Sequence, residues 1–510
     1  MNAVDPRTPC IIGVGSRTWH PDDVGEAGAP EPLAMWVDVA RAAATDSRGR
    51  DVLNAVDSVN VVYCQTTQYD DPPARLAETL GISPRHRYYS GIGGTTTQQL
   101  VSTAAEAILK NERDVVLIAS AEALATQRKA KQKGERIAYS FRPAEKRPYP
   151  WEAPMHPAEI AHEVFQAWLT FAVFDNARRA HRAEPLDLYR REIGEMMAPL
   201  TEIAARNPDA WFPIERTADE LVTPSAGNRM VGYPYTKYMV AIMDIDMAAA
   251  LIVTSHERAD ALGVPADLRV YLRGWCYATD PVYVAEHREM WRSPAMAAAA
   301  SAAAQQANVA IDDLAHFDLY SCFGSSLNFA RDALGLEPDD ARPLSVTGGL
   351  PYHGGPGSGY MTHSIAQMAR VLRGDPGALG MVSGVGMTMT KHVFGVYSTT
   401  PAAVTPPDQM SVQAALDEVD QAVIADTWDG DATVAAYSVV HGRDGGPEWA
   451  LLVCDVESDG SCRTYARSSD AELMACAESE ELVGQRVQLE STALDLPTGP
   501  GHRNLATLAR

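Results

Sequence analysis

Short apolar segments alternate with amphipathic ones along the first third of the chain. Continuous apolar runs occupy residues 10–15, 59–63 and 114–120, and helically spaced apolar positions occupy 32–46 and a segment from about residue 95. Apolar strands separated by helices are typical of a buried, mostly parallel sheet. The pattern therefore predicts an α/β domain.

Long helical patterns replace the strands between residues 123 and 240. They cover residues 156–182 and 186–206, between loops that contain proline. A block of helices inside an α/β chain predicts an insertion that sits on the sheet.

Strands and helices alternate again after this insertion. The echo between GIGG-helix-ERDVVLIAS and GGLPYHGGPG-helix-GALGMVSG indicates two related halves. The predicted strands of this part are residues 248–255, 268–274, 316–320, 379–384 and 393–398, with an alanine-rich helix at 293–306.

The end of the chain has a different character. Residues 432–451 and 481–494 alternate apolar and polar positions around Gly/Asp turns, which predicts a small β-rich domain. The complete division assigns 1–122 with 241–265 to a first half, 123–240 to the insertion, 266–405 to a second half, and 410–500 to the added domain.

Composition fits this organisation. A chain of 510 residues exceeds one hydrophobic core, and 46% hydrophobic with 21% charged residues is ordinary for a globular protein. No apolar run has the roughly 18–20 residues that cross a bilayer, and the N-terminus lacks a signal-peptide pattern. We therefore expect a cytoplasmic protein without a membrane partner.

Cysteine usage and charge exclude two further classes. The seven cysteines form no C-x-x-C pair, so we expect reduced thiols, no disulfide framework and no structural metal. A formal net charge of −23 repels a phosphate backbone, so nucleic acid is not an expected partner. The one dense basic stretch, residues 128–133, is consistent with a solvated loop.

Two Gly-rich turns each follow a strand and open a helix, within residues 91–124 and 346–374. Such a turn directs backbone N–H groups and the positive end of a helix dipole at one point, which suits a carboxylate or an oxyanion. Glycine at such turns also has purely steric explanations, so neither turn alone is decisive.

Three further segments occur with these turns in a specific order. Residues 244–255 resemble the D-G-A-A-A segment of thiolases, residues 318–323 the H-D-C-F block of sterol-carrier-type thiolases, and residues 384–392 the closing Gly-rich block. With the N-terminal IIGVG, the resemblance covers about residues 8–400, and it is nearest to the type 1 thiolase-like proteins with an additional C-terminal domain. It implies a duplicated thiolase fold of five αβαβα layers with a helical loop-domain insertion, followed by a small OB-like barrel.

The resemblance also shows where this chain departs from thiolases. The family's nucleophilic cysteine falls on Gly94, which has no side chain to acylate, and the next residue is Thr95. The histidine of the family's G-H-P block falls on Gly355, after Gly354, while His353 lies two positions earlier. Covalent thiolysis is therefore expected to be lost.

The other catalytic blocks are partly kept. The H-D-C-F block retains Cys322 but has Tyr320 in place of its histidine, and the closing cysteine falls near Val382 or Ser383. Each of Tyr320, Cys322 and His353 could equally be a packed residue with a satisfied polar group. Thiolase-fold aldolases that lack the nucleophile use a tyrosine near this position, where it needs only to exchange a proton.

The candidate site follows from these residues. Cys322, Tyr320 and His353 are the catalytic candidates, Gly94, Thr95, Gly354, Gly355 and Ser383 form a predicted thioester cradle, and Lys237, with the stretch 128–133, could meet CoA phosphates. The resemblance implies CoA or acyl-CoA as ligand, a place in lipid metabolism and no covalently bound cofactor.

Three functions stay open at this point. The first is an acyl-CoA-binding protein of the acetyl-CoA acetyltransferase superfamily without classical thiolase activity. The second is a retro-aldol or retro-Claisen lyase without an acyl-enzyme, with Tyr320 and Cys322 as proton carriers. The third is a non-enzymatic scaffold whose C-terminal domain binds partners. Thiolases commonly pair through their sheets, so a homodimer is the default expectation, and a monomer is the alternative if the added domain covers that surface.

Overall fold

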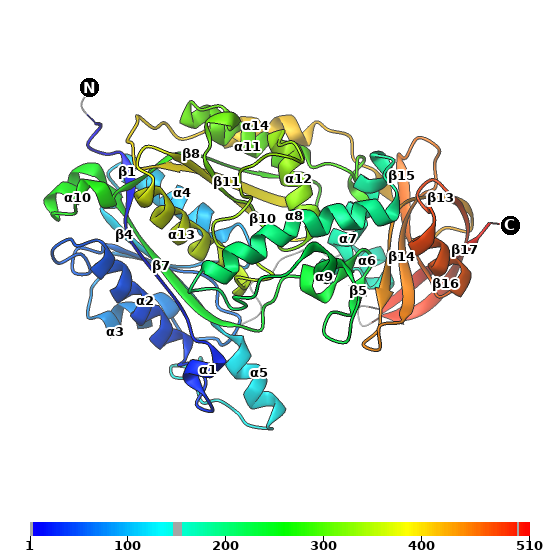
Figure 1. The fold of residues 1–510 in the computed structure, drawn as a ribbon, viewed down its shortest axis with the longest axis horizontal. Coiled ribbons are helices and arrows are strands. Elements are labelled where there is room, and N and C mark those ends of the chain that lie inside the picture. Colours follow the sequence, from blue (N-terminus) through cyan, green and yellow to red (C-terminus); the bar gives the residue numbers. More distant parts are fainter. Residues whose placement is uncertain (1–3, 146–155, 497–498, 510) are drawn as a thin grey trace.

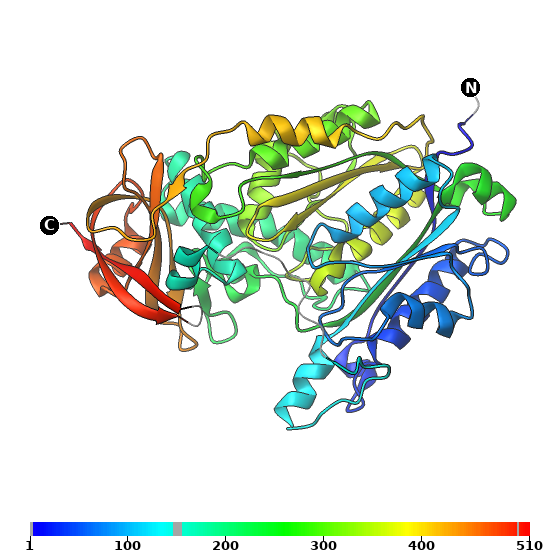
Figure 2. The ribbon, with the colours of Figure 1, turned by 180° about the vertical axis from the view of Figure 1, so that it is seen from behind.

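A nine-stranded sheet runs through the body of the protein. The computed structural model describes residues 4–145, 156–496 and 499–509, and Figures 1 and 2 show it from two sides. The strand order is β3-β2-β4-β7-β1-β8-β11-β10-β9. The strands are β1 (Pro9–Thr18), β2 (Ser58–Val61), β3 (His86–Tyr89), β4 (Val115–Ala123), β7 (Asp246–Ser255), β8 (Val270–Thr279), β9 (His316–Asp318), β10 (Leu379–Gly386) and β11 (Lys391–Ser398).

This sheet consists of two halves with the same topology. In the first half β2 and β4 are parallel, β4 and β7 are antiparallel, and β7 and β1 are antiparallel. In the second half β9 and β10 are parallel, β10 and β11 are antiparallel, and β11 and β8 are antiparallel. Only two residue pairs, Cys10 with Tyr271 and Ile11 with Val270, join the halves through β1 and β8.

Helices form three layers around the two halves. The helices α4 (Thr96–Leu109) and α13 (Tyr360–Gly374) contact each other and strands of both halves, so they form the central layer (Figure 2). One outer layer contains α2 (Pro32–Asp46) and α3 (Pro72–Leu80), with α1 (Pro21–Val24) and α10 (His256–Ala261) nearby. The other contains α11 (Pro294–Ala307), α12 (Gly324–Leu334) and α14 (Gln409–Asp417).

Close helix–strand packing repeats in both halves. A side chain on Gly13 of β1 would collide with the carbonyl oxygen of Ala43 in α2, and one on Gly274 of β8 would collide with that of Ala303 in α11. Glycine at these two positions lets each outer helix approach its strand closely. The duplication is thus visible in packing as well as in topology.

The segment between β4 and β7 leaves the sheet. It contains α5 (Leu124–Gln132), α6 (Pro157–His162), α7 (Ala167–His181), α8 (Leu186–Arg206) and α9 (Ala218–Val222), then β5 (Met230–Gly232), β6 (Tyr235–Thr236) and the 3₁₀ helix η1 (Lys237–Met239). The helix predicted at residues 156–182 is wrong as one element, because the chain takes a left-handed turn at Glu163 (φ 60°) and α7 starts four residues later.

The C-terminal segment is a closed five-stranded barrel. Its strands β13 (Gly430–His441), β14 (Pro447–Asp455), β15 (Cys462–Ser468), β16 (Arg486–Leu496) and β17 (Gly499–Leu508) pair in the order β13-β14-β15-β17-β16-β13. If the five strands are numbered in chain order, they pair in the order 1-2-3-5-4-1, and α15 (Ala471–Ser479) lies between the third and fourth strands in the chain. This is the arrangement of a small OB-like barrel. The short strand β12 (Val423–Ile424) pairs with β15 at its side.

The barrel is attached to the insertion. Strand β5 pairs with β13, and the buried His162 of α6 accepts a hydrogen bond from the amide of Asn504 on β17 at 2.9 Å. The guanidinium of Arg179 on α7, 2% exposed, forms two 2.7 Å hydrogen bonds to the Glu481 carboxylate. Figure 1 shows the barrel at the end of the molecule opposite the N-terminus.

The predicted fold class is confirmed: a duplicated α/β body of five helix and strand layers, a helical insertion and a small C-terminal barrel. No helix in the described ranges is long and apolar enough to cross a membrane. The strand expected at 268–274 continues to Thr279, and that expected at 316–320 ends at Asp318.

Candidate functional site

Gly94 lies in the turn before α4, where the central helix begins. A Cβ atom on Gly94 would collide with the carbonyl oxygen of Val385 and lie 2.5 Å from the Tyr320 hydroxyl oxygen. The backbone of Gly94 is outside the left-handed region, so space and not torsion excludes a side chain. The position expected to carry a nucleophile is therefore closed by a strand carbonyl and an aromatic ring.

Tyr320 fills this position from the loop after β9. Its amide donates to Ser383 Oγ at 2.9 Å, and its ring packs edge-on against Tyr360, with 5.5 Å between centroids. Burial, with a smaller contribution from the neighbouring thiol of Cys322, raises the pKa of Tyr320, so the phenol is neutral. Within the described residues its hydroxyl has no hydrogen-bond partner. Ser383 thus positions Tyr320 from β10.

Cys322 lies two residues further on, just before α12. The thiol donates to Ser326 Oγ over 3.6 Å, and burial raises its pKa to about 12. Its carbonyl accepts a hydrogen bond from the amide of Ala241 at 3.0 Å. A nucleophilic cysteine requires the thiolate, and this environment maintains the thiol.

His353 is buried in the second Gly-rich turn. Its Nδ1 lies 3.3 Å from the Asn207 side-chain nitrogen, and Nε2 has no partner within the described chain. Burial lowers the pKa of His353 to about 4, against the opposing effect of Asp209 and Asp318. The ring is therefore neutral, and it lies 6.1 Å from that of Tyr360 and 5.3 Å from that of His363.

The two glycines after His353 have structural partners. Gly354 adopts a φ of +107°, which favours glycine, and the amide of Gly355 donates to the carbonyl of Ile242 at 2.8 Å. Since that N–H is already used, it cannot also face a thioester oxygen. Gly355 instead ties the second turn to the end of the insertion.

The first turn has free donors. No hydrogen bond in the described part of the chain uses the amides of Gly94 or Thr95, and these amides precede the 14-residue helix α4. Thr95 is buried, and its hydroxyl accepts from Gln99 Nε2 at 2.8 Å. Two free amides at a helix N-terminus suit a carbonyl oxygen that gains negative charge.

The central helices hold the two turns together. The amide of Gly93 donates to Ser358 Oγ at 3.0 Å, and the hydroxyls of Thr97 and Thr362 lie 2.9 Å apart. These contacts link the start of α4 to the start of α13. The two Gly-rich turns expected from the sequence thus meet at one place between the halves.

The basic candidates lie elsewhere. Lys237 is exposed in η1, while Lys129 and Lys133 of α5 both pair with Glu26. Arg128 forms an ion pair with Asp244. Two carboxylates, those of Glu26 and Asp244, therefore offset part of the charge of this stretch within the protein.

Sequence reasoning missed two features near the turns. Met387 and Met389, between β10 and β11, have φ of 58° and 63°, a conformation that costs energy for residues other than glycine. Glu122 at the end of β4 is fully buried, and burial raises its pKa to about 7 although the amides of Gln65 and Thr66 donate to it. For Glu122 the sequence does carry a signal, since it is a lone acidic residue near the end of an apolar strand.

In the described ranges, no group of three or more His, Cys, Asp or Glu side chains is placed to hold a metal ion. The arrangement combines a neutral phenol, a neutral imidazole, a protonated thiol and two free backbone amides. Such a set can polarise a carbonyl and supply a proton, and it offers no activated nucleophile.

Comparison with known proteins gives a consistent result. A family model described as the thiolase-like protein type 1 additional C-terminal domain matches residues 411–493. The crystal structure of a monomeric SCP2-thiolase like protein type 1 from Mycobacterium smegmatis is similar with a TM-score of 0.84 and 31% sequence identity, over 99% of this chain and 100% of that chain. No curated protein matches the sequence.

More distant structures share the fold alone. The Ltp2-ChsH2(DUF35) aldolase is 18% identical with a TM-score of 0.59, over 77% of this chain and 98% of that chain. Human mitochondrial 3-ketoacyl-CoA thiolase, solved in complex with CoA, is 15% identical with a TM-score of 0.54, over 78% of this chain and 100% of that chain.

Proposed function

The chain belongs to the SCP2-thiolase-like proteins of type 1, and from that premise we propose that it binds acyl-CoA thioesters without forming an acyl-enzyme. The observation that carries this proposal is the closed space at Gly94, where Val385 and Tyr320 leave no room for a nucleophilic side chain. Covalent thiolase chemistry needs a thiolate beside an oxyanion hole, and Cys322 is held as a thiol by burial.

The remaining cradle supports binding of a thioester carbonyl. The free amides of Gly94 and Thr95, at the positive end of α4, are the donors that would meet the carbonyl oxygen. Gly355 is not among these donors, because Ile242 occupies its N–H. The exposed Lys237 remains the candidate for a CoA phosphate contact.

Two measurements on the full chain test this proposal. Isothermal calorimetry with CoA and acetoacetyl-CoA should show saturable binding, and intact-protein mass spectrometry after incubation with acetoacetyl-CoA should show no acetyl adduct. Absence of saturable heat with either ligand would favour a non-enzymatic scaffold. A stable adduct on any cysteine would refute the non-covalent mechanism.

The position of Tyr320 supports a second candidate, a carbon–carbon lyase acting on β-hydroxyacyl-CoA. In a retro-aldol cleavage the β-hydroxyl loses its proton, the Cα–Cβ bond breaks, a carbonyl product leaves and Cα takes up a proton. In this candidate the neutral Tyr320 phenol, which lies next to Gly94 and has no hydrogen-bond partner in the described chain, would donate that last proton.

Turnover assays separate the two candidates. If the lyase candidate is correct, a panel of β-hydroxyacyl-CoAs should give a shortened acyl-CoA, and Tyr320→Phe should lower kcat by at least about tenfold with little change in KM. Cys322→Ala is the parallel variant, because Cys322 is the other expected proton carrier, and unchanged turnover in Cys322→Ala would assign the proton transfer to Tyr320. Equal turnover by wild type and Tyr320→Phe would exclude Tyr320 as the proton donor.

A further inference from the structure

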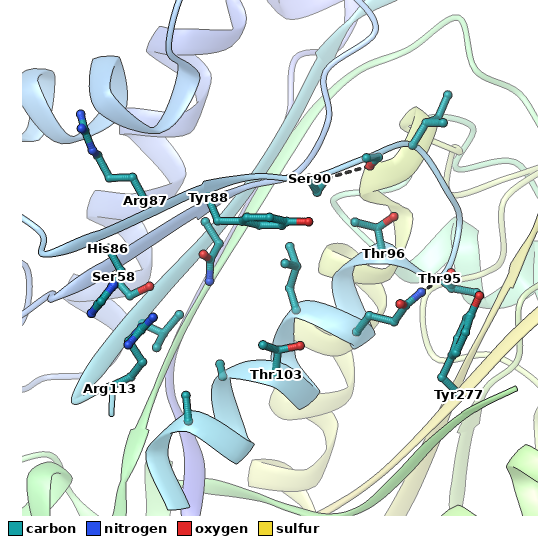
Figure 3. A pocket seen from close by; sticks show the side chains of 18 of the residues that line it. Ser58, His86, Arg87, Tyr88, Ser90, Thr95, Thr96, Thr103, Arg113 and Tyr277 are labelled. Carbon is teal, nitrogen blue, oxygen red and sulfur yellow. Dashed lines mark hydrogen bonds between the residues drawn. The ribbon is translucent and has the colours of Figure 1, made fainter. Parts of the chain in front are cut away.

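A pocket of about 610 Å³ opens beside α4. It lies between the strands β2 and β3 on one side and α4 on the other, and the ends of β8 and β11 close it (Figure 3). Neither Gly94 nor Tyr320 lines it. The volume is in the range of small-molecule sites in proteins.

The lining of this pocket is cationic. Arg87, Arg113 and Lys391 line it together with His86, and no aspartate or glutamate does, although the chain has 66 acidic residues against 43 Lys and Arg. The guanidinium of Arg113 donates a hydrogen bond to the backbone carbonyl of Glu112. A guanidinium nitrogen of the half-exposed Arg87 lies 3.7 Å from a carboxylate oxygen of Asp71. Neither acidic side chain reaches the lining, so the pocket is a local positive region on an acidic protein.

The two ends of the pocket differ. Figure 3 shows His86 and Arg113 at one end and Thr95, Thr96 and Tyr277 at the other, while the guanidinium of Arg87 turns to the far side of β3, away from Arg113. Between the two ends, α4 presents Thr103 and small residues to the pocket. Tyr88 is 54% exposed and lies across the opening. An anionic group at the arginine end and a flat, uncharged group against Tyr88 would both find complementary surfaces.

A second copy of the chain is a poor occupant. In a two-fold dimer the same patch faces itself, so Arg87, Arg113 and Lys391 of one copy would approach those of the other. Charged residues are depleted at the centres of protein interfaces, and like charges there cost binding energy. A homodimer that used this face would therefore be unfavourable for this chain.

We propose that this pocket binds a phosphorylated small molecule of nucleotide size, with its phosphates at Arg113 beside His86 and its ring system against Tyr88. Thr95 lines one end of this pocket and also belongs to the thioester cradle, but the Arg113 end is separate from Gly94 and Tyr320, and the proposal does not depend on acyl-CoA binding. Guanidinium groups bind phosphate oxygens through paired hydrogen bonds, which makes the arginine end the specific part of the site.

The test uses ADP as the probe and the full-length chain in calorimetry at 50 mM NaCl. We expect saturable binding of one ADP per chain, weakened at least about tenfold by Arg113→Ala combined with Lys391→Ala and weakened by 300 mM NaCl. Arg206→Ala removes an exposed cation of α8 and is the matched control, which should bind ADP as wild type does. Thermal unfolding of each variant verifies that it is folded.

Three results would overturn the proposal. They are no saturable heat with ADP, unchanged affinity in the folded double variant, and adenosine binding as tightly as ADP. Sedimentation gives a further decisive outcome: a wild-type dimer that dissociates in the double variant would make this face a subunit interface instead. Because CoA binding at the Gly94 turn is measured separately, failure here leaves the acyl-CoA proposal standing or falling on its own result.

Discussion

Replacement of Gly94 by alanine tests the feature on which the proposed function depends. The added methyl group would overlap the carbonyl oxygen of Val385 and come within 2.5 Å of the Tyr320 hydroxyl. Val385 belongs to β10 and pairs with His392 of β11, which restrains its backbone. Excess volume in a packed core costs about 1–3 kcal/mol, and contact with fixed backbone favours the upper end.

We therefore expect Gly94→Ala to lower the free energy of unfolding by about 3 kcal/mol. This corresponds to a fall of roughly 6 °C or more in the midpoint of thermal unfolding, at about 2–4 °C for each kcal/mol. Gly91→Ala is the matched control in the same turn, because no heavy atom lies within 4 Å of the position of its Cβ. It should melt within about 1 °C of wild type.

A double variant identifies which neighbour causes the loss. Tyr320→Ala alone removes a buried ring and should cost about 3–5 kcal/mol. Combined with Gly94→Ala it should cost less than the sum of the single variants, by about 1 kcal/mol, because the ring contact is gone while the contact with Val385 persists. A Gly94→Ala protein as stable as wild type, or strict additivity in the double variant, would refute the closed-site argument.

Three further predictions follow from buried groups. Burial lowers the pKa of His162 to about 4, so the contribution of this residue to the free energy of unfolding should be nearly constant above pH 6.5 and fall by about 3 kcal/mol between pH 6.5 and 4. Denaturant titrations should detect this contribution as the difference between the pH dependence of wild type and that of His162→Gln. The pKa of the buried Cys322 thiol is raised to about 12, so Cys322 should resist alkylation by iodoacetamide at pH 8 in the native protein. The part-exposed Cys476 should be alkylated before it, and peptide mass spectrometry measures both rates. Glu481→Gln leaves the Arg179 guanidinium without its charged partner and should lower the free energy of unfolding by about 2 kcal/mol, measured by thermal unfolding. An unchanged midpoint would show that this ion pair does not help to attach the barrel.

Much of the fold was predictable from the sequence because it depends on local patterns. Apolar runs and helical spacing located the strands and helices of both halves, and the repeated Gly-rich turns revealed the duplication. The break at Glu163 was not predictable, since a left-handed glutamate leaves no mark on the apolar pattern on either side of it. The closing of the barrel was only suggested, because the parallel pairing of β15 with β17 joins segments that are far apart in the chain.

The site was predictable in its location but not in its contents. Counting along the first turn led to Gly94, and the order of segments brought Tyr320 and Ser383 near it. The hydroxyl of Tyr320 over Gly94, and the use of the Gly355 amide by Ile242, depend on contacts between distant segments. No spacing rule in a single sequence reports such contacts, so Gly355 was wrongly grouped with the free donors of the cradle.

The added barrel is physically connected to the candidate site through the insertion. Asn176 of α7 donates to the carbonyl of Tyr437 in the barrel at 2.8 Å and to that of Tyr233 at 3.2 Å. Two residues after Tyr233, the hydroxyl of Tyr235 accepts a hydrogen bond from the amide of Ser325 at 3.0 Å. Ser325 lies at the start of α12, three residues after Cys322. A displacement of the barrel would therefore strain the segment that places Tyr320 over Gly94. The ring of Tyr320 closes the site at Gly94, so these hydrogen bonds connect the barrel to the closed site through the insertion.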